Sequence, residues 1–570
     1  MRHLLAIAIV AAACTGPDDT SSASAEERGP RFITIGADAL GTAQDVLAAR
    51  DPGAVLTPLA VENGIALLEY DAQDFLALSE QMHERHNRCS GFIRHGSIED
   101  GRDALAAPAR AAAALTYTID NGPTVNALMA ELRASAILTN ITELAAFKNR
   151  YYRSATGAQA SDFIADKWRN LAAAAGRSDI TVTQFTHPEF GQKSVILTIP
   201  GSTLANEVVV LGAHEDSIAP GGSTSTAPGA DDDASGIATL TEVLHALVAK
   251  NFHPQRTINI MAYAAEEVGL VGSQEIVDDF KSRGVNVVGV MQLDMTNFQG
   301  SDRDIWLMTD FTNAAQNKFV EDLIDKYTGA TRGTDACGYG CSDHASWFRK
   351  GFPASMPFEA RLSEYDPEIH TPNDTLELSD NNADHAVKFG RLGVAFAAEL
   401  GKGTADFSHD LLREEFEVGG WTATGLWHRT TSSLCGPPGF SSPIHAMYFG
   451  QDAKCNFDTG ARVSGTMTSP ALTGITAQST LRFRYYRDVQ KTNVSQNDVA
   501  RVAVIDGANR TVVWTRTSKT ASQPRWLVSD TISLAAFAGK SIQLRFEFDS
   551  ITQNNNTFVG WLVDDVVVTK

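Results

Sequence analysis

The sequence predicts a mixed α/β fold in which a mostly parallel central sheet is flanked by helices, preceded by a small α+β unit and followed by an all-β sandwich. The main observation is a set of three short Val/Ile-rich runs at residues 208–213, 258–265 and 287–293. Amphipathic helical patterns separate the runs, and this alternation is typical of buried parallel strands. The parallel sheet is therefore expected in the middle of the chain, at about residues 118–401.

Different patterns precede and follow this middle region. At residues 31–101, strand-like and helix-like segments alternate over the length of a small α+β domain. At residues 410–570, short alternating strands are separated by Gly, Asn and Ser turns, which indicates a β-sandwich. The Ala-rich segment 102–114 is predicted to be an exposed and cleavable linker. A chain of 570 residues is also too long for one core.

The first residues predict export. Residues 1–13 combine a short basic start with an apolar run that is too brief to span a bilayer, which is typical of an export signal. No later segment is expected to be long and apolar enough to span a bilayer. Two forms of signal stay open: ordinary cleavage after Ala25, or a lipoprotein-type signal in which Cys14 becomes a lipid anchor. The formal net charge of -21 argues against nucleic acid as a partner. We expect an exported monomer.

Four cysteines are placed for local pairing. Cys337 and Cys341 are close neighbours, and Cys435 and Cys455 flank one loop. In an oxidising compartment these positions predict two disulfides, Cys337 to Cys341 and Cys435 to Cys455. A thiolate zinc site is the alternative for the first pair, and export favours the disulfide.

Each Val/Ile-rich run ends in metal-binding side chains: His214, then Glu266 and Glu267, then Asp294. Because open α/β sheets bind their ligands beyond the carboxyl ends of the strands, we expect these side chains in one crevice. An Asp-rich loop at residues 231–233 and His370 extend the set. Zinc prefers His nitrogen and carboxylate oxygen, and hydrolytic zinc sites leave a position for water. The residues therefore predict a zinc hydrolase.

Five of these side chains are enough for two zinc ions if one carboxylate bridges them: His214, Asp232, Glu267, Asp294 and His370. Asp232 is the predicted bridge, because a strand-to-helix loop can present it at a helix N-terminus. Asp231 and Asp233 are expected to cap the helix or support the ligands. Seven other histidines, including His83, lack such a context and are predicted to be ordinary.

The adjacent residues Glu266 and Glu267 are expected to have different roles. Both reach the crevice if the backbone turns there, with Glu267 on the metal and Glu266 as the general base. Asp216, two residues after His214, is a candidate to hold that imidazole in the right tautomer.

Residues 134–401 resemble the secreted two-zinc bacterial leucyl aminopeptidases. The matching stretches occur in family order, at residues 157–161, 212–217, 227–238, 265–267, 292–297, 337–347 and 369–371. The resemblance implies one zinc on Asp232, Glu267 and His370, and a second on His214, Asp232 and Asp294. It further implies a cis peptide bond between the residues at 232 and 233, and the 337–341 disulfide.

The resemblance also implies how substrate binds. Glu266 would be the base, Tyr339 would hydrogen-bond the oxyanion, and a peptide with a free amino group would be the substrate. A pocket for its N-terminal side chain would be lined by Met295, Met308, Phe358, Leu362 and Tyr365. Such a wall favours leucine-like residues as a preference only, since one methylene changes binding by about 1–3 kcal/mol.

The flanking regions resemble further parts of such enzymes. Residues 31–101 are similar to their propeptides, which block the site and assist folding, although a retained accessory domain is an alternative. The C-terminal region resembles MAM-like jelly-roll modules, with its tryptophans expected in the core. Asp564 and Asp565 are candidates for calcium, and a solvated strand end is the favoured interpretation.

We therefore predict a zinc aminopeptidase that removes leucine-like residues. Two alternatives stay open: a related zinc carboxypeptidase, deacylase or glutaminyl cyclase, and an inert protein whose sandwich binds a surface ligand.

Overall fold

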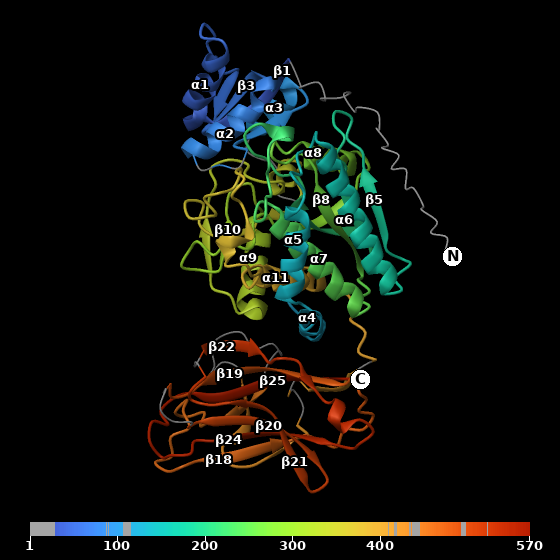
Figure 1. Cartoon of the computed structure of the whole chain (residues 1–570), viewed down its shortest axis with the longest axis vertical. Coiled ribbons are helices and arrows are strands. Elements are labelled where there is room, and N and C mark those ends of the chain that lie inside the picture. Colours follow the sequence, from blue (N-terminus) through green and yellow to red (C-terminus); the bar gives the residue numbers. More distant parts are fainter. Residues whose placement is uncertain are drawn as a thin grey trace, which may run out of the picture.

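The computed structural model contains three units in chain order (Figure 1). It describes residues 29–86, 88, 90–105, 116–408, 410–414, 416, 419–431, 435, 445–491, 497–520 and 523–570. The predicted signal, Cys14 and most of the predicted linker lie outside the described residues. Among those described, no helix is both long and apolar enough to cross a membrane.

The N-terminal unit is a four-stranded antiparallel sheet, in the order β2-β3-β1-β4, with three helices. Its elements are β1 (Pro30–Gly36), α1 (Leu40–Arg50), β2 (Ala60–Glu62), β3 (Ile65–Asp71), α2 (Phe75–His86), β4 (Phe92–His95) and α3 (Ile98–Leu105). The linker prediction is wrong at residues 102–105. These residues complete α3, because the side chain of Leu105 is buried and holds the end of that helix.

The middle unit is built on a six-stranded mixed sheet in the order β12-β9-β7-β8-β6-β5. The strands are β5 (Thr181–Phe185), β6 (Ser194–Ile199), β7 (Leu204–His214), β8 (Arg256–Tyr263), β9 (Asn286–Gln292) and β12 (Ala354–Ser355). The pairings among β12, β9, β7 and β8 are parallel, whereas β6 and β5 run antiparallel. All three Val/Ile-rich runs form neighbouring strands here, and the predicted fold class is confirmed.

Helices cover both faces of this sheet. They are α4 (Gly122–Met129), α5 (Ala134–Ala145), α6 (Ala155–Ala174), α7 (Ala234–Ala249), α8 (Val271–Ser282), α9 (Ala314–Leu323), α10 (His344–Arg349) and α11 (Ala386–Gly401). The helix α7 follows directly from the Asp-rich loop and is buried along almost its whole length, so the sheet and α11 fix its position. A small second sheet joins β10 (Ile305–Met308), β11 (Arg332–Asp335) and β13 (Pro357–Phe358).

The C-terminal unit is a β-sandwich, as predicted. One sheet contains β14 (Asp410–Glu414), β16 (Trp427–Thr431), β17 (His445–Phe449), β19 (Thr480–Asp488), β22 (Gln523–Val528), β23 (Ile532–Ser533) and β25 (Gly560–Thr569). The other contains β15 (Thr422–Ala423), β18 (Ser464–Thr468), β20 (Val499–Asp506), β21 (Asn509–Arg516) and β24 (Gln543–Asp549). Aromatic side chains fill the space between the sheets, with Trp514 stacked on Trp561.

The prediction of a solvated strand end at Asp564 and Asp565 is wrong. Both side chains are buried, at 0% and 5% exposure, because β25 is an interior strand between β17 and β19. Asp565 accepts hydrogen bonds from Asn126 Nδ2 of α4, both at 3.2 Å. This carboxylate therefore joins the sandwich to the middle unit.

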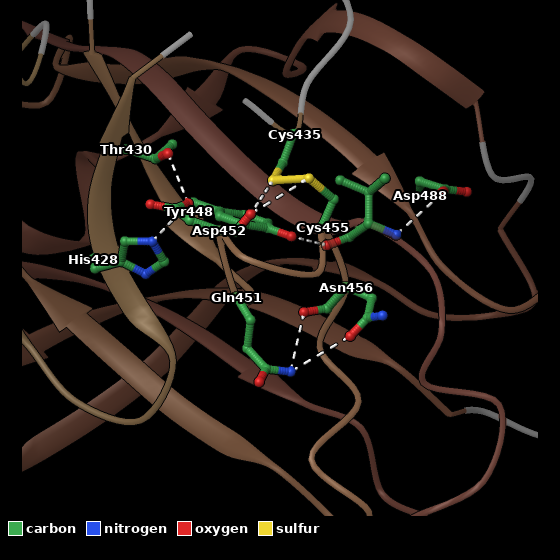
Figure 2. Close-up of a disulfide and its surroundings, with 10 residues drawn as sticks. His428, Thr430, Cys435, Tyr448, Gln451, Asp452, Cys455, Asn456 and Asp488 are labelled. Carbon is green, nitrogen blue, oxygen red and sulfur yellow. Dashed lines mark hydrogen bonds and ion pairs between the residues drawn. A yellow bond between two sulfur atoms is a disulfide. The ribbon is translucent and has the colours of Figure 1, made fainter. Parts of the chain in front are cut away.

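Both predicted disulfides are present in the structure. Figure 2 shows the bridge between Cys435 and Cys455 beside Asp452, whose side chain accepts a hydrogen bond of 2.8 Å from Thr430. The bridge closes a loop between residues 20 positions apart.

Candidate active site

The predicted crevice forms where three parallel strands end side by side. His214 is the last residue of β7, Glu266 and Glu267 follow β8, and Asp294 follows β9. Because β7 lies between β8 and β9 in register, the three strand ends meet at one edge of the sheet. His370 reaches the same place from a loop before α11.

Asp232 lies between two histidines. Its Oδ1 is 2.9 Å from His214 Nε2, and its Oδ2 is 3.3 Å from His370 Nε2. On the first side, Asp294 Oδ1 is 3.5 Å from the same His214 nitrogen. On the second side, Glu267 Oε2 is 2.8 Å from the His370 nitrogen. The structure thus brings the five residues into two triplets that share one carboxylate.

These side chains fit zinc. All five are buried, and the carboxylates of Asp232 and Glu267 are fully enclosed without a hydrogen-bond donor outside this cluster. Buried carboxylates are costly unless they are paired or bind a metal, and nitrogen with oxygen is the donor set that zinc prefers. His370 and His214 hold the pKa of Asp232 below its ordinary value, although burial alone would raise it.

A compact set of His, Asp and Glu atoms also includes Asp233 with His214 and Asp294. The oxygens of Asp233 are already used, however, because they accept hydrogen bonds from the backbone N–H of His214, of Gly236 and of Met295. We therefore assign Asp233 to the N-cap of α7 and to support of the strand ends.

Two residues that the sequence did not single out hold the Asp-rich loop. Asp374 accepts hydrogen bonds from the backbone N–H groups of Asp231 and Asp232, at 2.8 and 3.1 Å. The fully buried Arg150 donates to the carbonyl groups of Glu215 and Gly229, at 2.9 Å each. The peptide bond between Asp232 and its successor is cis, as the resemblance implied.

The backbone turns where the adjacent glutamates require it. Ala265 has a φ of 54°, a left-handed conformation that is strained for a residue with a side chain. Asp216 accepts the N–H groups of Glu266 and Glu267, at 3.0 and 3.3 Å, and lies 3.5 Å from His214 Nδ1. Asp216 therefore supports both glutamates more directly than the imidazole.

Burial raises the pKa of both glutamates. The pKa of Glu267 rises to about 7, and Asp232 adds to the effect of burial. The pKa of Glu266 rises well above its ordinary value, again through burial first, while His214 opposes the rise. Within the part of the chain that the structure describes, neither oxygen of Glu266 has a hydrogen-bond partner. This carboxyl group is thus free to exchange a proton with a bound molecule.

The residues predicted for the substrate pocket form one apolar cluster. Its members are Met295, Met308, Cys337, Tyr339, Cys341, Met356, Phe358, Ala360, Tyr365 and Ile369, with Leu362 packed against it. The disulfide and the small second sheet hold this cluster beside His370, which follows Ile369.

The sequence did not predict a role for His83, but the structure places it at the site. This residue of α2 has its ring centroid 5.2 Å from that of His370, and its Nδ1 is 3.4 Å from the hydroxyl of Tyr365. Arg88, from the same unit, lies over the ring of Tyr339 at 5.1 Å. In Figure 1 the N-terminal unit sits directly on the middle unit.

The comparisons with known proteins agree with this geometry. Residues 194–394 match the model of peptidase family M28. Leucine aminopeptidase 1 of Arthroderma gypseum is 37% identical over 310 residues, which cover 52% of this chain and 82% of the fungal protein. The chain belongs to peptidase family M28. Leucine aminopeptidase 1 of Metarhizium robertsii is 36% identical over 292 residues, covering 49% of the chain and 73% of that protein.

The structural comparison extends further along this M28 chain. The LapA aminopeptidase of Legionella pneumophila aligns with a TM-score of 0.57 and 28% identity, covering 66% of this chain and 99% of LapA. LapB of the same organism gives a TM-score of 0.56 and 27% identity, covering 65% and 100%. Together with the metal-binding cluster, these relatives identify the protein as a zinc aminopeptidase, a hydrolase of peptide bonds.

Proposed function

We propose that this M28 enzyme is an exported two-zinc aminopeptidase that removes leucine-like N-terminal residues from peptides. The observation that carries the proposal is the position of Asp232, with one oxygen toward each histidine. The residues that would hold the metals are His214, Asp232 and Asp294 on one side, and Asp232, Glu267 and His370 on the other.

The reaction follows from the groups around this centre. Bound zinc lowers the pKa of a water molecule to about 7 and polarises a carbonyl group. Glu266 accepts the proton of the attacking water and delivers it to the leaving amine, which its unpartnered oxygens allow. The hydroxyl of Tyr339 donates a hydrogen bond to the carbonyl oxygen as negative charge develops there.

The apolar cluster supplies the preference among substrates. Met295, Met308, Phe358 and Tyr365 are all buried, and Leu362 is partly exposed at the edge. A flexible wall that contains two methionines accepts leucine, methionine or phenylalanine, since methionine adapts to different shapes. We expect a ranking among these residues and no strict selection.

Hydrolysis of leucine 4-nitroanilide tests this function. Protein freed of its N-terminal unit and supplied with zinc is expected to release nitroaniline, whereas N-acetyl-leucine 4-nitroanilide is expected to react at least about 100-fold more slowly in kcat/KM. The reason is that a buried site built for a polar group discriminates strongly against an analogue in which that group is absent. Equal hydrolysis of both compounds would indicate a deacylase or an endopeptidase.

The N-terminal unit is proposed to be a propeptide that blocks the site. Every predicted metal-binding side chain is at most 7% exposed with this unit in place, and His83 of the unit lies against His370 with the ring centroids 5.2 Å apart. The backbone N–H of Arg94 donates to the carbonyl of Gly269, close to the glutamates, at 3.1 Å. Lys350 of the middle unit pairs with Asp100 at 3.1 Å. Cleavage in the predicted linker, at residues 106–114, would release the unit.

Loosening this unit is expected to activate the uncleaved chain. Replacing His83 and Arg88 by Ala removes the ring contact with His370 and the cation–π contact with Tyr339. A loss of about 1.4 kcal/mol in docking raises the open population, and hence leucine-anilide hydrolysis, about tenfold. Activity is measured on uncleaved protein, verified by electrophoresis.

Arg85→Ala is the matched control for this double variant. Arg85 lies on the same helix, but it pairs with Asp45 inside the N-terminal unit and is largely exposed. It should leave the activity of the uncleaved chain unchanged. An inactive double variant that becomes fully active on cleavage would show that other contacts hold the unit in place.

The remaining parts of the proposal rest on the sequence. Export, with or without a lipid on Cys14, rests on the N-terminal signal pattern. The C-terminal sandwich is proposed to be a MAM-like accessory module, and the enzyme is proposed to act as a monomer. The sheet order and the buried aromatic core of the sandwich support a separate module.

A further inference from the structure

We infer that a cavity between α4 and the sandwich binds a small monocarboxylate with an apolar body, distant from the zinc site. The cavity has a volume of about 290 Å³ and lies between the C-terminal part of α4 and the outer face of the seven-stranded sheet. This volume is at the small end of the range for ligand sites, about 300–1,000 Å³. In Figure 1, α4 points from the middle unit toward this sheet.

The alternation of β19 aims its arginines into the cavity. Leu481 and Phe483 pack into the core of the sandwich, so Arg482 and Arg484 face outward, toward α4. On the neighbouring strand β25, Val567 lies opposite Arg482 and lines the same wall. A sheet face that would otherwise meet solvent thus presents two cations to a partly enclosed cavity.

Arg484 is the main observation. Its side chain is buried, and its Nε and Nη1 atoms have no hydrogen-bond partner among the described residues. Burial lowers the pKa of this guanidinium, while Asp565 and Asp564 oppose the change. Asp565 lies nearby, yet its oxygens accept from Asn126 and do not reach those two nitrogens. The charge of Arg484 thus has buried carboxylates nearby, but two of its nitrogens lack a hydrogen-bond partner, which an anion in the cavity would supply.

Two other arginines that line the cavity favour the same carboxylate ligand. Arg413 is paired with Asp410 at 2.8 Å, but its Nη1 is buried and unpartnered. In the described ranges, the one hydrogen bond of Arg482 goes to the hydroxyl of Thr531, at 2.7 Å. Guanidinium groups bind carboxylates through paired N–H donors, which this arrangement leaves available.

The rest of the lining selects a singly charged ligand with an apolar body. Glu131 and Asp565 also face the cavity, together with Lys250. Lys250 pairs with Glu131 at 3.3 Å and Arg413 pairs with Asp410 at 2.8 Å, so these ion pairs use part of the positive charge and favour a singly charged ligand over a phosphate dianion. Apolar contacts come from Ala127, Met129 and Val528. Two kinds of molecule carry a single carboxylate on an apolar body: a fatty acid, and an apolar amino acid whose amino group is blocked.

Titration calorimetry of the full chain with sodium octanoate and with N-acetyl-leucine tests the inference. At least one of them is expected to bind with one-to-one stoichiometry, and the tighter of the two indicates the source of the ligand. Octanamide, which has the same apolar body without the charge, is expected to bind at least about tenfold more weakly than octanoate. If neither carboxylate binds the full chain, the inference is wrong.

Variants locate the binding. Arg484→Met is expected to weaken it at least about tenfold, and Arg462→Met, which alters a mostly exposed arginine paired with Asp549, should leave it unchanged. If Arg484→Met does not fold, Arg482→Gln takes its place and should weaken binding several-fold. Binding that is unaffected by a folded cavity variant would overturn the inference. Leucine-anilide hydrolysis after activation should be equal in all of these variants, because none touches the zinc site.

Discussion

Glu266→Gln is expected to lower kcat for leucine 4-nitroanilide by about 10²–10⁴-fold, with little change in KM. This range is what a positioned general acid–base group contributes. The amide matches the carboxylate in shape, and the N–H of residue 266 keeps its hydrogen bond to Asp216. The lost property is the ability to accept a proton, so the effect belongs to the chemical step.

Two measurements distinguish the loss of proton transfer in Glu266→Gln from a structural effect. The zinc content of the Gln variant should equal that of the wild type, because Glu267 and not Glu266 contacts His370. Glu275→Gln is the matched control on α8, where this partly exposed side chain contacts His187. Its kcat should be unchanged. Near-normal kcat in Glu266→Gln would mean that a different group moves the proton.

The sequence was sufficient for the centre of the site, because parallel strands leave little freedom there. Once β7, β8 and β9 are recognised as neighbours, the residues after each strand must share one edge of the sheet. Register and burial then decide the distances, as for His214 with Asp232 and Asp294. The position of Asp232 between the two histidines could be predicted from its place in the loop before α7.

The supporting residues could not be predicted in the same way. Asp374 and Arg150 act through backbone groups that lie 65 to 143 positions away in sequence, and no local pattern marks such contacts. Asp216 lies beside the imidazole of His214, as predicted, at 3.5 Å from Nδ1, but its two hydrogen bonds from the N–H groups of Glu266 and Glu267 depend on the turn at Ala265, which no local pattern indicated.

The contacts between units could not be predicted from the sequence for a related reason. His83 has an ordinary helical context, and only the docking of α2 brings it to His370. Arg482 and Arg484 alternate as a solvated strand face would, and the position of α4 encloses them. Alternation along a strand identifies the face of a side chain, but it does not identify what covers that face.

Asp232→Asn is expected to remove at least one of two zinc ions and to reduce leucine-anilide hydrolysis to background. Both oxygens of this carboxylate face histidine nitrogens, so one substitution weakens both triplets. Loss of an outer hydrogen-bond partner alone costs about 10–100-fold in metal affinity, and loss of a shared ligand should cost more. Bound zinc is measured by elemental analysis after dialysis, beside activity.

Asp231→Asn is the control for this variant, with the same chemical change one position earlier. Its Oδ1 accepts a hydrogen bond from Asn297 N–H at 3.0 Å, which an amide oxygen can also do. Its other oxygen has no hydrogen-bond partner among the described residues, and the Glu359 carboxyl group nearby can accept from an amide N–H. The Asp231 variant should therefore keep its zinc and most of its activity. If it loses metal as completely as Asp232→Asn, the loop as a whole carries the site, and the bridging role of Asp232 is wrong.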